Sequence, residues 1–170
     1  MSSAINPNVA TGKAVQLDDG VYWVGALDPG LRTFDIILST ANGTSYNAYL
    51  IEGDEGLAVI DTVKEEFADE FFQRLVSVTV YSRFKYIVLN HLEPDHTGAL
   101  TELLKRAPQA HVYISQRAQS MLKALLKDSR DTLNYTAVQT GDTLSLGNCT
   151  LQILNTPFLH WPDTECTYLQ

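Results

Sequence analysis

The sequence predicts an α/β (α+β) fold in which helices cover a mixed β-sheet. Short apolar runs joined by turn residues indicate antiparallel hairpins. Apolar residues at three- to four-residue spacing indicate amphipathic helices. Apolar strands that alternate with these helices indicate strand–helix–strand units. The sheet is therefore expected to combine parallel and antiparallel strands.

Two hairpins are expected in the first third of the chain. One surrounds the turn Asp18-Asp19-Gly20 within the apolar stretches of Val15–Val24. The other joins a strand at Tyr46–Ile51 to a strand at Leu57–Asp61 through the turn Gly53–Gly56. Both hairpins place antiparallel strands early in the fold.

Helices and strands alternate in the rest of the chain. An amphipathic helix is predicted by the spacing of Phe67, Phe71, Leu75 and Val78. The residues that follow predict strands at Tyr86–Leu89, His111–Ile114, Thr136–Gln139, Thr143–Leu146 and Cys149–Leu154, a helix over Thr97–Ala107, and a last strand starting at Thr167. Ser115 is expected to cap a further helix that buries Ala118, Met121, Leu122 and Leu125.

Composition excludes several classes of function. The chain has 170 residues, of which 45% are hydrophobic and 19% charged, as in an ordinary soluble domain. Its formal charge of −8 disfavours nucleic acid and anionic membrane surfaces as partners. No apolar run is long enough to cross a bilayer, and the first residues do not resemble a signal peptide. We therefore expect a cytoplasmic protein whose two cysteines, Cys149 and Cys166, stay reduced.

A cluster of candidate metal ligands follows the strand that ends at Leu89. His91, Glu93, Asp95 and His96 fall within six positions, in a loop between a buried strand and a helix. Loops at strand ends are common places for binding groups, because the sheet fixes their position. Imidazole nitrogen combined with carboxylate oxygen suits iron, zinc or manganese. A solvated loop with accidental ion pairs is the alternative, but this spacing directly after an apolar strand favours a metal site.

The cluster resembles the diiron motif of flavodiiron proteins. The metallo-β-lactamase superfamily carries His-x-His-x-Asp-His at the equivalent strand exit, and flavodiiron proteins replace the second histidine by glutamate, as Glu93 does here. Further segments that are similar to this family are Thr44–Ile51, Ala58–Val63 and Asn155–Thr164, so that the resemblance runs from about Gly20 to Leu169. It implies a metallo-β-lactamase-like αββα sandwich.

The resemblance also implies a set of metal ligands. His91 and Glu93 would bind one iron together with His160, and Asp95 and His96 would bind the second iron. The family's bridging aspartate and last histidine have no counterpart after His160. We therefore expect residues 1–170 to be the N-terminal part of the domain, without its C-terminal part and without the flavodoxin-like domain that binds FMN.

The function implied is the reduction of dioxygen to water, of nitric oxide to nitrous oxide, or of both. Electrons would reach the two irons through FMN from a rubredoxin-like donor or a fused flavin reductase. The part by itself is expected to be inactive, and its open sheet edge favours a homo-oligomer. Two alternatives stay open: a di-zinc hydrolase of the same fold, and a non-catalytic binding domain that keeps the scaffold.

Several other residues carry weaker expectations. Asp61 either orients a ligand histidine or caps the helix that starts near Glu65. Asp163 is expected to be a turn residue, and His111 to be structural. The phenylalanines Phe67, Phe71 and Phe72 are expected in the core rather than in a flavin site. Glu165 and Cys166 stand where the family resemblance predicts apolar residues.

Overall fold

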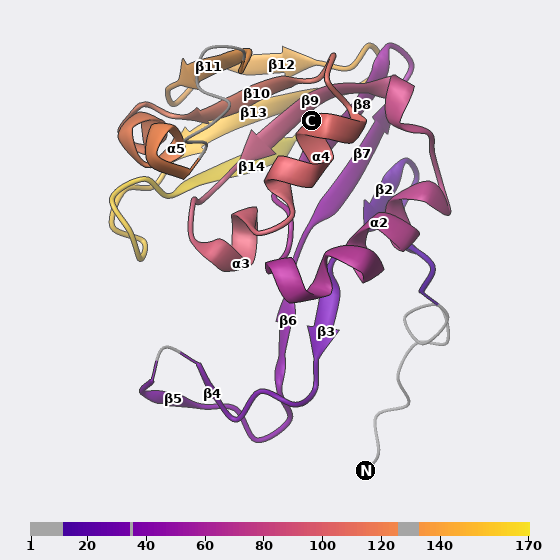
Figure 1. The fold of residues 1–170 in the computed structure, drawn as a ribbon. Coiled ribbons are helices and arrows are strands. Elements are labelled where there is room, and N and C mark those ends of the chain that lie inside the picture. Colours follow the sequence, from indigo (N-terminus) through magenta and orange to yellow (C-terminus); the bar gives the residue numbers. More distant parts are fainter. Residues whose placement is uncertain (1–11, 35, 126–132) are drawn as a thin grey trace.

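The computed structural model describes residues 12–34, 36–125 and 133–170. Its largest element is a seven-stranded mixed sheet with the order β1-β2-β7-β8-β9-β10-β11 (Figure 1). The strands are β1 (Val15–Asp18), β2 (Val21–Trp23), β7 (Tyr49–Gly53), β8 (Gly56–Ile60), β9 (Phe84–Leu89), β10 (His111–Ser115) and β11 (Tyr135–Val138). The pairs from β1 to β8 are antiparallel, and those from β8 to β11 are parallel. The sheet is therefore mixed, as the sequence predicts.

A second sheet lies against one face of the first. It is antiparallel and contains β12 (Thr143–Ser145), β13 (Thr150–Asn155) and β14 (Glu165–Leu169). One apolar cluster fills the space between the sheets, with Ile60 and Val88 from the first sheet and Leu151 and Ile153 from the second. The two sheets thus form the ββ layers of the expected sandwich.

Helices cover the opposite face of the large sheet. They are α2 (Ala68–Val76), α3 (Pro94–Thr97), α4 (Leu100–Arg106) and α5 (Gln119–Leu125), with the short 3-10 helices η1 (Glu65–Phe67), η2 (Tyr81–Arg83) and η3 (Gln116–Ala118). Phe71 of α2, Leu103 of α4 and Leu122 of α5 share one apolar cluster with Val59 of β8. Because Ala58 and Ile60 belong to the other cluster, β8 is buried on both faces, which explains its continuous apolar sequence.

Two small ribbons extend from the body of the fold. β3 (Ala26–Asp28) pairs with β6 (Thr44–Tyr46), and β4 (Thr33–Phe34) pairs with β5 (Leu38–Ser39) at the far end (Figure 1). The sequence did not predict these ribbons. The strand expected at Tyr46–Ile51 is in fact divided, because Tyr46 ends β6 and Tyr49 begins β7.

Most of the other predicted elements are confirmed. Ser115 accepts a hydrogen bond from the backbone N–H of Ala118, so it caps a helix as expected, although the first turn is the 3-10 helix η3. One expectation is wrong, because Leu125 is 43% exposed rather than buried. The helix predicted over Thr97–Ala107 is confirmed as α4, although it begins later, at Leu100, after the separate short helix α3.

The topology brings three chain segments to one edge of the molecule. β8 and β9 are parallel neighbours, so the residues after Ile60 and after Leu89 leave the sheet at the same edge. The loop between β13 and β14 reaches this edge as well, because the backbone N–H of Glu165 donates to the carbonyl oxygen of Asn90. The candidate ligands lie where these segments meet. Within the described residues, no helix is both long and apolar enough to cross a membrane.

Candidate metal centre

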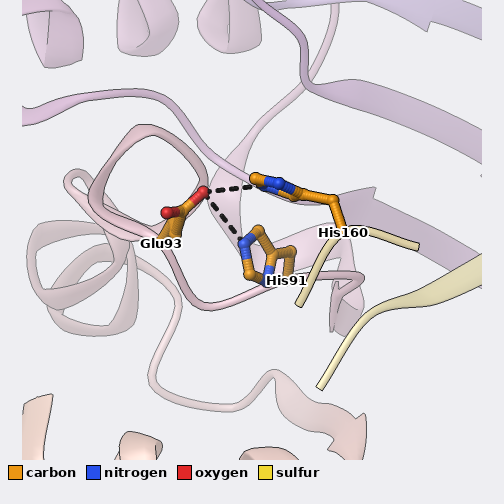
Figure 2. A group of neighbouring side chains, drawn as sticks. All are labelled: His91, Glu93 and His160. Carbon is orange, nitrogen blue, oxygen red and sulfur yellow. Dashed lines mark hydrogen bonds and ion pairs between the residues drawn. The ribbon is translucent and has the colours of Figure 1, made fainter. Parts of the chain in front are cut away.

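Three side chains from both sheets meet at this edge (Figure 2). His91 and Glu93 follow β9 of the large sheet, and His160 lies in the loop between β13 and β14 of the small sheet. One carboxylate oxygen, Oε2 of Glu93, lies 3.1 Å from Nε2 of His91 and 3.1 Å from Nε2 of His160. A potential ligand atom of each residue lies within 4.8 Å of the other two. The potential ligand atoms of the three residues therefore surround one small volume.

Glu93 and the histidines differ in exposure. The side chain of His91 is 3% exposed, that of Glu93 is 17% exposed and that of His160 is 54% exposed. The indole ring of Trp161 lies 5.9 Å from the imidazole ring of His91, centroid to centroid. The group is thus anchored by a buried histidine and open to solvent at His160.

The two nitrogens of His91 have different surroundings. Nδ1 lies 3.0 Å from Oδ2 of Asp163, in a buried contact between the two side chains. Nε2 is buried, and its 3.1 Å contact with Oε2 of Glu93 lacks hydrogen-bond geometry, so it has no hydrogen-bond partner among the described residues. When Nδ1 carries the proton and donates it to Asp163, the lone pair of Nε2 points to Glu93 and His160. A buried imidazole nitrogen without a hydrogen bond fits a metal ligand, since it would otherwise be costly to desolvate.

Asp163 has a larger role than the sequence predicts. It lies in a turn, as expected, but it is also only 1% exposed. Its Oδ2 accepts a second hydrogen bond, from the backbone N–H of Leu92 at 2.9 Å. Asp163 therefore fixes both the ring of His91 and the backbone of the ligand loop. Its position three residues after His160 was the only signal in the sequence.

His96 has its own carboxylate partner. Its Nδ1 lies 3.1 Å from Oδ2 of Asp61, and Oδ1 of Asp61 accepts a hydrogen bond of 2.7 Å from the backbone N–H of Asn90. Asp61 adopts a left-handed backbone conformation, with φ of 58°, which aspartate tolerates better than most residues. This contact with His96 is the one that the first of the two alternatives for Asp61 requires. The capping alternative is wrong, because η1 has Lys64 at its N-cap and no side-chain cap.

The charge of His96 is stabilised by its acidic surroundings. Burial lowers the pKa of His96, but the hydrogen bond and the charge of Asp61 outweigh it and raise the pKa overall. His96 Nε2 lies 3.7 Å from Oδ2 of Asp95. This pair is outside the converging group of His91, Glu93 and His160, although the rings of His91 and His96 are only 5.3 Å apart.

A pocket opens beside the carboxylates of the ligand loop. It has a volume of about 280 Å³ and is lined by Glu93, Asp95, Tyr46, Phe34 and Lys64, among others. The Tyr46 hydroxyl donates to Oδ2 of Asp28, and burial followed by this contact holds its pKa far above the usual range. Tyr46 is thus a neutral phenol in the wall of the pocket.

The other singled-out residues lie away from this centre. His111 is on β10, where its Nε2 contacts the hydroxyl of Thr136, in line with a structural role. Phe71 and Phe72 are buried in the core, and Phe67 packs against it, so the expectation that they are core residues is confirmed. Both cysteines are free.

Comparisons with known proteins agree with this geometry. Residues 44–170 match the family described as ODP family beta lactamase. The type A flavoprotein FprA of Rhodobacter capsulatus is 61% identical over 155 residues, which is 91% of this chain and 36% of that protein. A nitric oxide reductase of Moorella thermoacetica is 44% identical over 91% of this chain and 38% of its own length.

Solved structures of flavodiiron proteins are similar to this chain as well. The flavodiiron protein of Giardia intestinalis is 35% identical with a TM-score of 0.84, over 92% of this chain and 37% of that chain. The rubredoxin oxygen:oxidoreductase of Desulfovibrio gigas is 35% identical with a TM-score of 0.86, over 92% of this chain and 38% of that chain. The present chain therefore spans well under half the length of these relatives. It belongs to the flavodiiron protein family and carries the metallo-β-lactamase-like part of it.

Proposed function

We propose that this chain is part of the diiron domain of an oxidoreductase that reduces dioxygen to water, nitric oxide to nitrous oxide, or both. The observation that carries the proposal is the position of Glu93, whose carboxylate lies between the Nε2 atoms of His91 and His160. A hydrolase of this fold has a neutral imidazole at the position of Glu93. An anionic oxygen ligand favours harder, redox-active iron over zinc.

The ligand sets follow from this arrangement. His91, Glu93 and His160 would hold one iron, and Asp95 with His96 would hold the second. The short separation of the His91 and His96 rings, 5.3 Å, supports two neighbouring metal positions. The pair of irons, when bound, would supply the electrons and the binding site for a diatomic substrate.

The protein's own residues prepare that chemistry. Asp163 and Asp61 each accept a hydrogen bond from the Nδ1 of a candidate ligand histidine, which orients Nε2 toward the metal position. At His96, whose pKa is raised, a metal ion would displace the proton from Nε2. The pocket beside Glu93 is large enough for a diatomic molecule, and Phe34 and Tyr46 give it apolar walls.

The complete protein would contain more than this chain. We propose that the rest of the metallo-β-lactamase-like domain, with a bridging aspartate and a last histidine, and a flavodoxin-like domain with FMN lie outside residues 1–170. The names of two relatives, a nitric oxide reductase and a rubredoxin oxygen:oxidoreductase, support these substrates and a rubredoxin-like or fused flavin reductase as electron source. A homo-oligomer and a cytoplasmic location complete the proposal, and the two free cysteines fit a reducing compartment.

Metal content and gas consumption of the full-length protein test the proposal. We expect about two irons per protomer and consumption of dioxygen or nitric oxide when the flavin is reduced. Glu93→His should lower the iron content and the reduction rate, because it restores the imidazole set that suits zinc. The exposed substitution Asp69→Asn is the control and should change neither.

The di-zinc hydrolase predicts the opposite outcome. Two zinc ions, hydrolysis of an ester or phosphodiester, and no gas consumption would contradict the proposal. A non-catalytic binding domain would keep its function in both Glu93→Ala and His160→Ala. The redox enzyme should lose activity in both variants.

A further inference from the structure

Glu165 is an acidic residue in an apolar place. It is the first residue of β14 and is only 1% exposed. The family resemblance leads one to expect an apolar side chain here, and nothing in the proposed iron coordination uses a carboxylate at this position. A buried acid that has no structural or ligand role requires another explanation.

Among the residues that the structure describes, a neutral side chain is the hydrogen-bond partner of the Glu165 carboxyl group. Oε2 accepts a hydrogen bond of 3.1 Å from the side-chain amide of Asn155, on the neighbouring strand β13. Oε1 is buried and has no hydrogen-bond partner among the described residues. One weak donor cannot offset the cost of burying a carboxylate, whereas a protonated carboxyl group costs much less.

The charged groups that face Glu165 are negative, so they disfavour its carboxylate form. Asp61 lies at the end of β8 and Asp163 in the turn before β14, and each is bonded to a ligand histidine. Burial, and then the charges of Asp61 and Asp163, raise the pKa of Glu165 to about 8. Glu165 thus belongs to a group of three buried carboxyl groups directly behind the ligand histidines.

A pocket lies beside the hydrogen-bond partner of Glu165. This partner, Asn155, lines the pocket of about 190 Å³ together with Thr164, Arg117 and Ser115. Arg117 is the charged residue in that lining, and its guanidinium lies over the ring of Phe158. Water in the pocket could accept a proton that leaves the carboxyl group.

We propose that Glu165 stores a proton behind the metal centre and releases it when metal cations bind. The inference rests on the metal site proposed above. In the metal-free protein the carboxyl group is neutral. Cations held by His91 and His96 offset the charges of Asp61 and Asp163, so the Glu165 O–H bond ionises. The proton passes to water, and the carboxylate stays behind as a counter-charge to the metals.

Infrared spectroscopy tests the stored proton without any metal. We expect a C=O stretch of a protonated carboxyl group in the metal-free wild type at pH 7, which disappears as the pH rises above the pKa of Glu165. Glu165→Gln should lack this band. Absence of a band that depends on Glu165 would overturn the proposal.

Calorimetry with Zn²⁺ alone tests whether metal binding releases the proton of Glu165. Titrations in buffers of different ionisation enthalpy count the protons released, and wild type should release about one more than Glu165→Gln at pH 7. Glu102→Gln is the matched control, because the pKa of Glu102 is lowered by its hydrogen bond to Arg106 and it has no proton to release. Circular dichroism verifies that each variant is folded.

The outcomes separate the two proposals. Equal proton release by wild type and Glu165→Gln, with zinc bound by both, would overturn the stored proton and leave the metal site intact. Failure of all three proteins to bind zinc would contradict the metal site and, with it, release on metal binding.

Discussion

At the scale of single residues, the carboxylate of Asp163 orients the candidate ligand His91. Its Oδ2 accepts hydrogen bonds from Nδ1 of His91 and from the backbone N–H of Leu92. We predict that Asp163→Asn lowers the affinity for Zn²⁺ about 10- to 100-fold, because His91 loses the partner that fixes its tautomer and ring orientation. Competition with a chelator measures the dissociation constant.

Asp69→Asn is the control for that experiment. Asp69 lies on the exposed face of α2 and carries the same charge, so its replacement should leave the zinc affinity unchanged. An unchanged affinity in Asp163→Asn would contradict an orienting role for Asp163. The buried position would then serve the fold alone.

Glu165 should make the stability of the metal-free protein fall with rising pH. Its pKa is raised from 4.5 to about 8, so the folded state retains a proton that the unfolded state loses above pH 4.5. This group's contribution to stability is therefore complete at low pH and is lost progressively up to about pH 8. Denaturant unfolding at pH 5 and pH 8 should show a fall in the free energy of unfolding of wild type that exceeds the fall in Glu165→Gln by about 3–4 kcal/mol. An equal fall in the free energy of unfolding in wild type and Glu165→Gln would refute the prediction.

The sequence indicates candidate metal ligands when they are close together in the chain. His91, Glu93, Asp95 and His96 stand in one loop, so residue type and spacing indicate a metal site directly. His160 could be assigned only through a family resemblance, because 67 residues separate it from Glu93. Asp163 was predicted as a turn residue because its bond to His91 depends on how the β13–β14 loop packs against the exit of β9. The role of such a residue requires the tertiary structure.

At the scale of elements, the helix predicted over Thr97–Ala107 begins later than the apolar spacing indicates, at Leu100 of α4. A neighbouring segment takes up backbone hydrogen bonding just before that residue. The backbone N–H of Thr62 donates to the carbonyl of His96, and the N–H of Ala99 donates to the carbonyl of Val63. Local periodicity cannot show this competition. These two hydrogen bonds hold the segment after β8, where Asp61 lies, next to His96.

Gly98 makes this close approach of the two segments possible. A Cβ atom at Gly98 would collide with the backbone nitrogen of Glu65. We predict that Gly98→Ala destabilises the protein by about 1–3 kcal/mol, as overpacking does when backbone must move. It should also weaken metal binding, since it separates Asp61 from His96. Thermal unfolding and a zinc titration measure the two effects.

Gly30 is the matched control for Gly98. A Cβ atom there would have its nearest contact at 3.6 Å, with the carboxylate of Asp28, which is ordinary van der Waals distance. Gly30→Ala should therefore leave stability within about 0.5 kcal/mol of wild type. Equal effects of the two substitutions would mean that the approach of Glu65 to Gly98 is not needed for the fold.

At the scale of the whole molecule, the proposed metal centre lies between the two sheets. His91 and Glu93 follow β9 of the seven-stranded sheet, and His160 precedes β14 of the three-stranded sheet. Apart from this group, an apolar cluster between the sheets holds them together. A metal ion bound by all three residues would add a cross-link that the unfolded chain cannot form.

We therefore predict that Zn²⁺ raises the thermal midpoint of the chain and that His160→Ala removes most of this gain. A ligand at 100 times its dissociation constant stabilises the folded state by about 2.7 kcal/mol, and loss of one of three ligands lowers the affinity and hence the gain. His111→Ala is the histidine control, because His111 lies on β10 outside the candidate ligand group, so its replacement should leave the gain from Zn²⁺ unchanged. Scanning calorimetry with Zn²⁺ and with a chelator compares the three proteins. An equal gain in His160→Ala and wild type would show that the metal does not connect the two sheets.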